Sequence, residues 1–189
     1  MNTKGQSIRE KIITTADELF YKNGYNTTSF SDISQAVGIS RGNFYHHFKS
    51  KDDILAAVIE YRKTIINERL QQWNLTYTAP YDRLNCYIDM MIGLKDDIYK
   101  HGCPVGSVCA EITKLRNINQ ANATEMISLF LNWMDKQFAS LGYDEQRSHQ
   151  LSMHLVSRTQ GISLMTNAFS DQEFLLREME QLKEWLAGL

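Results

Sequence analysis

The sequence predicts an all-α protein. Only two prolines, Pro80 and Pro104, occur among its 189 residues, so long stretches run without a strong helix breaker. Apolar residues recur at helical spacing along the chain, and no segment shows the alternation of a strand. Hydrophobic residues at 43% and charged residues at 22% are ordinary for a globular protein. We expect about nine helices, divided into a three-helix N-terminal head of residues 1–50 and a helical body of residues 51–189.

Serine caps mark the helix starts of the head. The four serines that precede an apolar helical pattern are Ser7, Ser29, Ser40 and Ser50. Three of them have an acidic residue three positions later, which is the capping-box spacing. Gly24 and Gly38 follow the first and second helices and can adopt the left-handed conformation that ends a helix. The fourth helix has no break before Trp73, so we expect the head and the body to share it.

The body is predicted to hold the remaining helices. Pro80 suits the first turn of a helix that continues to His101, and residues 74–79 before it are expected to form a loop. Pro104 and Gly106 mark a turn. After it, the pattern predicts helices over residues 105–115, 120–141, 144–168 and 171–186.

Charge is distributed unevenly along the chain. The formal net charge is -2, yet residues 1–51 carry seven Lys and Arg against four Asp and Glu, giving +3, and the remaining residues carry -5. A mildly basic head before an acidic body suggests that the head contacts nucleic acid and that the body has a different task.

Two short helices joined by Gly38-Ile39-Ser40 have the dimensions of a helix-turn-helix, whose second helix can lie in the major groove. The flanking residues run Thr28-Ser29-Phe30-Ser31-Asp32-Ile33-Ser34 and then Ala36 to Lys51, with a Tyr45-His46-His47-Phe48-Lys49-Ser50-Lys51 ending. This pattern resembles the signature of the TetR family of bacterial transcriptional regulators. The resemblance covers roughly residues 8–60, and Ser34 stands where the family usually has alanine.

Helical periodicity separates a core face from a reading face in the second of these helices. Phe44 and Phe48 share an apolar face, whereas Arg41 could donate two hydrogen bonds to guanine and Asn43 could pair with a base edge. Gly42 suggests a close approach to DNA or to a neighbouring helix. The resemblance implies phosphate contacts at Thr28, Tyr45, His47 and Lys51. The predicted DNA-binding residues are Thr28, Ser40, Arg41, Gly42, Asn43, Tyr45, His46, His47 and Lys51; a merely solvated face is the alternative.

A head of charge +3 makes few phosphate contacts, so we expect a homodimer on a palindromic operator. The last two helices carry more apolar surface than one core needs, and the resemblance implies that this pair forms a four-helix dimer interface. The predicted interface residues are Leu151, Leu155, Ile162, Met165, Phe174, Leu175, Met179 and Leu182. An intramolecular core is the alternative interpretation of the same residues.

Large, adaptable side chains are spread over the body helices. The resemblance implies a pocket there for a lipophilic or aromatic effector that releases a repressor from its operator. The predicted effector residues are Tyr61, Ile65, Arg69, Trp73, Tyr87, Met91, Cys103, Phe130, Trp133, Met134 and Arg158. Each could instead be a core residue, and the two arginines could pair with acids.

The cysteines, Cys86, Cys103 and Cys109, are odd in number and irregularly spaced, and the N-terminus is polar; we therefore expect a cytoplasmic protein with no membrane segment. Cys103 could be a thiol sensor of electrophiles or oxidants, or a small buried residue in a tight turn. A metal site of His101, Cys103 and Cys109 lacks paired Cys-x-x-Cys spacing.

Enzyme motifs such as a phosphate-binding glycine loop, H-E-x-x-H or G-x-S-x-G are missing from the sequence, which argues against an enzyme, and we expect no cofactor. A helical module that binds a partner protein, without DNA, is the competing class.

Overall fold

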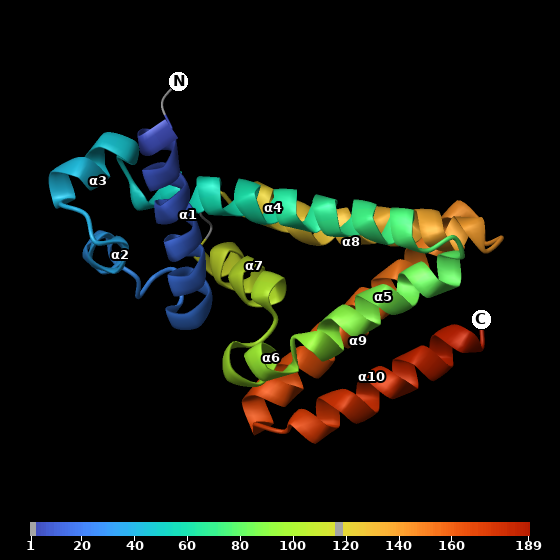
Figure 1. The fold of residues 1–189 in the computed structure, drawn as a ribbon. Coiled ribbons are helices and arrows are strands. Elements are labelled where there is room, and N and C mark those ends of the chain that lie inside the picture. The colour runs from blue at the N-terminus through green and yellow to red at the C-terminus, as the bar shows by residue number, and fades with distance from the viewer. Residues whose placement is uncertain (1–2, 116–118) are drawn as a thin grey trace. The chain divides into compact units, whose positions relative to one another are not determined.

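The computed structural model describes residues 3–115 and 119–189, and within them every regular element is an α-helix (Figure 1). The helices are α1 Thr3–Asn23, α2 Phe30–Val37, α3 Arg41–His47, α4 Lys51–Thr76, α5 Pro80–Gly93, α6 Lys95–His101, α7 Pro104–Leu115, α8 Gln120–Ser140, α9 Glu145–Phe169 and α10 Gln172–Ala187. The predicted all-α class is confirmed.

Cap geometry confirms the short helices of the head. The Ser29 hydroxyl accepts a hydrogen bond from the Asp32 backbone N–H, and the Asp32 carboxylate accepts one from the Ser29 N–H. Ser50 and Asp53 form the same reciprocal pair at the start of α4. Each pair satisfies backbone donors that would otherwise lack a partner in the first helical turn.

Four boundaries differ from the prediction. The fourth helix continues to Thr76, so residues 74–76, which were expected in a loop, are helical. The first helix begins at Thr3, so Ser7 lies inside it and does not cap it. The helix predicted from Pro80 to His101 is two helices, because the backbone of Leu94 turns out of helical geometry after Gly93. Pro104 occupies the first turn of α7, where its missing N–H costs nothing, so the turn expected at Pro104 and Gly106 is helical.

The chain forms two compact units. The first joins the described residues up to Thr64 with Ser107–Met126, and the second joins Ile65–Gly106 with Ile127–Leu189. In the first unit, α2 packs on α1 and on α3. Its buried apolar residues are Ile12, Ala16, Phe20, Ile33, Val37, Phe44, Phe48, Ile54, Leu55, Val58 and Ile59.

In the second unit, α10 packs along α5 and α9, and α6 packs against α9 (Figure 1). The core of this unit includes Leu84, Ile88, Met91, Met134, Phe138, Leu155, Leu175, Met179 and Leu182, all buried. Among the described residues, no helix is both long enough and apolar enough to cross a membrane.

Candidate nucleic-acid interface and ligand groove

The turn between α2 and α3 is held by its backbone. Gly38 has φ 78° and ψ 35°, the left-handed conformation that glycine adopts without a steric penalty. Its N–H donates to the Ser34 carbonyl at 3.0 Å, and the N–H of Ile39 donates to the same carbonyl at 3.1 Å. The Ser40 hydroxyl then accepts from the Asn43 N–H, which starts α3. These bonds fix the direction in which α3 leaves α2.

One side of α3 is anchored and the other is exposed. Phe44 is the only described residue of this helix that is buried, and its ring meets the edge of Phe30 at a centroid distance of 5.2 Å. Burying a phenylalanine stabilises a fold by about 1.5–3 kcal/mol. The exposed residues of the helix are Arg41, Gly42, Asn43, Tyr45 and His46, and His47 is half-buried. The helix therefore presents donors and rings to solvent from a fixed base.

Two side chains of this face have neighbours that orient them. The Arg41 guanidinium donates to the Ser31 hydroxyl at 3.1 Å, and Tyr45, 46% exposed, lies against Phe30. At Gly42 an added Cβ would meet no atom within 4 Å. Close approach to a neighbouring helix, one of the two reasons predicted for this glycine, is therefore wrong within the described part of the chain.

Two of the predicted DNA-binding residues point into the protein. Thr28 is buried, and its hydroxyl bonds the Gly24 carbonyl at 2.7 Å and the Leu19 carbonyl at 3.3 Å. The Lys51 ammonium donates to the carbonyls of Tyr25 and Thr28 at 2.8 and 3.1 Å and lies over the Tyr25 ring. Both side chains support the loop before α2, and their predicted phosphate contacts stay predictions.

Glu111 on α7 also holds this loop, which sequence reasoning did not predict. Its carboxylate accepts hydrogen bonds from the backbone N–H groups of Tyr25 and Asn26, both at 2.9 Å. The amide of Asn119 donates to the Asp52 carbonyl in the first turn of α4. Glu111 thus binds N–H groups of the loop, and Lys51 binds its carbonyls. We call this arrangement of the two side chains the loop clamp. Its members lie far apart in sequence, so no local pattern reveals it.

Comparison with known proteins agrees with this geometry. The family model described as bacterial regulatory proteins, tetR family, matches residues 12–58, which contain α2, α3 and their turn. The HTH-type transcriptional regulator YxaF of Bacillus subtilis, itself uncharacterized, is 27% identical over 187 residues, 96% of each chain. A TetR transcriptional regulator from Legionella pneumophila superposes with a TM-score of 0.83 at 25% identity, covering 93% of this chain and 95% of that one. Together, these matches support a TetR-family regulator.

These similarities support a DNA-binding transcriptional regulator and not an enzyme. The HTH-type transcriptional regulator QacR of Staphylococcus aureus is 36% identical over 86 residues, 46% of each chain. TetR-family proteins also typically dimerise and respond to small molecules, so the second unit of this regulator is where such a site is sought.

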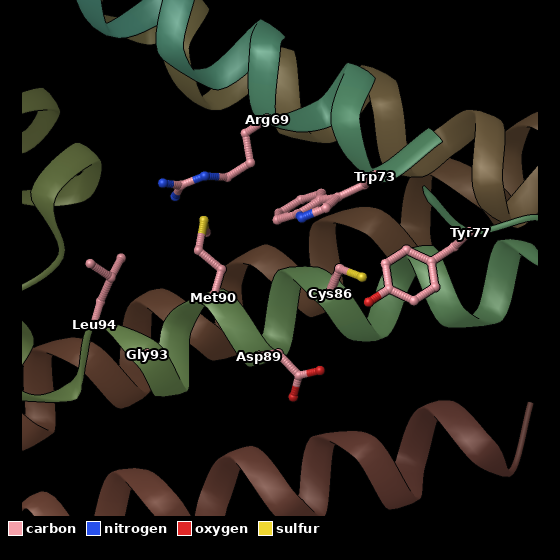
Figure 2. A pocket seen from close by; sticks show the side chains of 8 residues that line it. All are labelled: Arg69, Trp73, Tyr77, Cys86, Asp89, Met90, Gly93 and Leu94. Carbon is pink, nitrogen blue, oxygen red and sulfur yellow. The ribbon is translucent and has the colours of Figure 1, made fainter. Parts of the chain in front are cut away.

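The second unit has an open groove of about 440 Å³ between the end of α4 and α5 (Figure 2). It is lined by Arg69, Trp73, Tyr77, Cys86, Asp89, Met90, Gly93 and Leu94. A volume of this size suits a small organic molecule. Of the predicted effector residues, the structure brings Arg69 and Trp73 to this groove. The sequence analysis missed three of the lining residues, Tyr77, Cys86 and Asp89. They lie on an open polar rim, and a polar rim produces no hydrophobic periodicity in the sequence.

The other predicted effector residues lie elsewhere. Those buried in the interior are Tyr87, Met91, Cys103, Phe130, Trp133 and Met134. The Tyr87 hydroxyl bonds Thr159 at 2.9 Å, and burial raises the pKa of Tyr87 far above its usual value. Arg158 forms an ion pair with Glu178 at 3.4 Å. Ile65 lies at the surface. Tyr61 lines a hollow of the first unit together with Arg9 and Glu60.

Cys103 is packed. Its sulfur accepts hydrogen bonds from the Gly106 N–H and the Gln160 amide, both at 3.4 Å, and a Cβ at Gly106 would collide with that amide. This geometry favours the buried small residue over an accessible sensor thiol. Among the described residues, no three His, Cys, Asp or Glu side chains come together in a way that could hold a metal ion.

The predicted dimer residues divide between core and surface. Leu151, Leu155, Ile162, Leu175, Met179 and Leu182 are buried against their own chain, Phe174 is half-buried and Met165 is exposed. The exposed apolar residues of α9 and α10 are Met153, Leu164, Met165, Phe169 and Leu176. Periodicity identified the two helices but could not assign which apolar face turns inward.

Proposed function

We propose that this TetR-family regulator is a repressor that binds a palindromic operator as a homodimer and is released by a small molecule. The observation that carries the proposal is α3, which is anchored by Phe44 and exposes Arg41, Asn43, Tyr45 and His46. We assign DNA binding to residues 1–50 and ligand binding and dimerisation to residues 51–189.

In the proposed complex, α3 lies in the major groove. Arg41 donates to a guanine edge and Asn43 bonds a base edge, contacts worth about 1–3 kcal/mol each against the wrong base. Tyr45 and His47 reach phosphates, which sets the register of the helix without reading sequence. The Ser31 hydroxyl beside Arg41 supports this assignment, because it holds the guanidinium at the start of α3.

The proposed dimer uses the exposed apolar face of α9 and α10. Leu164 is 67% and Phe169 71% exposed, and such large apolar side chains in the last turns of α9 favour burial against a second copy. At Gly161, on the same helix, an added Cβ would meet nothing within 4 Å, so a partner backbone could approach closely. Leu164→Glu should give a monomer in sedimentation at micromolar concentration. Leu75→Glu, at a residue 83% exposed at the end of α4, is the control.

Release is proposed to act through α4, which only three residues separate from α3 and which contributes Arg69 and Trp73 to the groove. A ligand that shifts α4 changes the separation of two heads that must span one helical turn of DNA, about 34–36 Å. A preference of about 1–3 kcal/mol for the shifted state lowers operator affinity about five- to 150-fold.

The test begins by selecting duplexes from a random pool with the purified protein and measuring gel shifts at several salt concentrations. A palindromic consensus is expected, with Arg41→Ala and Asn43→Ala weakening the selected duplex more than random DNA. Lys22→Ala is the control, because this lysine pairs with Glu18 on α1. A protein that enriches no sequence, or whose variants bind like the wild type, would contradict the proposed reading face and favour the protein-interaction module.

A further inference from the structure

The groove between α4 and α5 has a definite charge. The Arg69 guanidinium forms no hydrogen bond or ion pair with any other described residue, and it extends over Met90 beside the Trp73 ring (Figure 2). The acid of the groove, Asp89, is bound by the Lys183 ammonium at 2.7 Å, and its side chain points toward α10 in the same view. The charge left available to a ligand is therefore the positive charge of Arg69.

An aromatic wall stands next to that charge. The Trp73 indole packs against Trp133 at a centroid distance of 5.4 Å, and the Trp133 N–H donates to the Asn74 side chain at 3.0 Å. Trp73 is thus held in place before any ligand arrives. A preorganised ring binds a flat aromatic group at low entropic cost, and stacked ring pairs contribute about 0.5–1.5 kcal/mol beyond their buried area.

The far end of the groove is uncharged. Tyr77 and Cys86 lie side by side there (Figure 2). Burial, together with the nearby carboxylates of Asp89 and Asp82, raises the pKa of the Cys86 thiol, and the Cys86 sulfur raises the pKa of Tyr77. Both groups stay protonated at neutral pH, so neither offers a charge to a ligand. A ligand's negative charge is favoured only at the Arg69 end.

We propose that the groove takes a small aromatic carboxylate, with its carboxylate on Arg69 and its ring on Trp73, directed toward Tyr77. This inference rests on the proposed function, because it names the chemical class of the effector. A guanidinium binds a carboxylate through two parallel hydrogen bonds, a geometry that an amine or a neutral hydroxyl of the ligand cannot reproduce. Gly93, with no side chain and no atom within 4 Å of an added Cβ, leaves room in the floor for the ring.

The experiment compares three probes of one shape by calorimetry on the full chain: 1-naphthoate, neutral 1-naphthalenemethanol and cationic 1-naphthylmethylammonium. The wild type should bind 1-naphthoate about ten- to a hundredfold more tightly than the alcohol, and the cation most weakly. Arg69→Gln should reduce 1-naphthoate affinity to that of the alcohol without changing the alcohol. Trp73→Leu should weaken both. Arg147→Gln, at an exposed arginine of α9, is the matched control and should change neither.

Three outcomes would overturn the inference: no preference for the carboxylate, a preference that survives Arg69→Gln, or no binding of 1-naphthoate at millimolar concentration. Release from a selected duplex is measured separately. If 1-naphthoate binds through Arg69 and the duplex stays bound, the groove's chemistry is supported and the proposed release fails. If another compound releases the duplex while 1-naphthoate does not bind, the proposed function is supported and the carboxylate class fails.

Discussion

The loop clamp predicts that one carboxylate on α7 stabilises the approach to the helix-turn-helix. Glu111 accepts two backbone N–H bonds at 2.9 Å, from Tyr25, which is buried, and from Asn26, which is exposed. Hydrogen bonds to a charged group contribute about 1.5–3 kcal/mol each, and the exposed bond less. Glu111→Ala should therefore lower the free energy of unfolding by about 2–4 kcal/mol. Glu111→Gln, which keeps one acceptor oxygen in place, should lose about half of that.

The sharpest measurement is hydrogen exchange at the two amides. A loss of about 2 kcal/mol in local stability makes exchange of the Tyr25 amide about 30-fold faster in Glu111→Ala, provided that it exchanges by local opening. Urea titration gives the global change in the same variants. The matched control is Glu68→Gln, which removes an exposed carboxylate on α4 that lies outside the first unit.

Exchange at Tyr25 and Asn26 that is the same in wild type and both Glu111 variants would refute the clamp. Faster exchange over all of α1 and α2 with no excess at these two amides would show instead that Glu111 acts on the whole unit. Because the loop precedes α2, the clamp also predicts weaker binding of a selected duplex by Glu111→Ala at unchanged dimer content.

The remaining predictions concern local geometry. Gly24→Ala should lower stability by about 1–2 kcal/mol in urea titration, because φ is 91° and the new Cβ would lie 3.3 Å from Thr27 Oγ1. Ser29→Ala should cost about 1 kcal/mol through the lost cap. It should also raise the pKa of Asp32, which hydrogen bonds from Ser29 hold below 3.8, as measured by NMR titration. A carboxyl group whose pKa is lower in the folded state stabilises that state at any pH above the pKa of the unfolded chain. The wild type should therefore lose this stabilisation as the pH falls below about 3.8. Phe44→Ala should cost about 3–5 kcal/mol and abolish specific DNA binding at temperatures that leave the wild type folded.

Local signals in the sequence were sufficient for the helix-turn-helix. Caps, a left-handed glycine and a short apolar period each depend on residues within four positions of one another, and the hydrogen bonds of Ser29, Ser40 and Gly38 confirm them. The break at Leu94 escaped prediction because its flanking residues continue the apolar pattern without a strong breaker.

Features made by residues distant in sequence were not predictable in the same way. Glu111 is 86 positions from Tyr25, and Lys51 was interpreted as a phosphate contact because a lysine at a helix start looks the same whether it faces DNA or its own loop. Arg69 and Trp73 were identified by chemical type. Tyr77 follows Trp73 by one helical turn, whereas Cys86 of α5 joins them only through the fold. Buried and exposed leucines of α9 differ only by which side of the helix faces α10.

The clamp and the groove together make a prediction about allosteric coupling. Helices α4, α7 and α8 each contain residues of both units, so α4 is one of three continuous helices that can transmit a change. Coupling is measured as the ratio of 1-naphthoate affinity without and with a selected duplex, and by reciprocity it equals the effect of the ligand on DNA affinity. Glu111→Gln should reduce this ratio while leaving 1-naphthoate affinity without DNA unchanged, because Glu111 belongs to the first unit and the groove to the second. Glu68→Gln should keep the wild-type ratio. An equal ratio in Glu111→Gln would show that the clamp takes no part in the coupling. A ratio of one in the wild type would show that the groove is not linked to DNA binding at all.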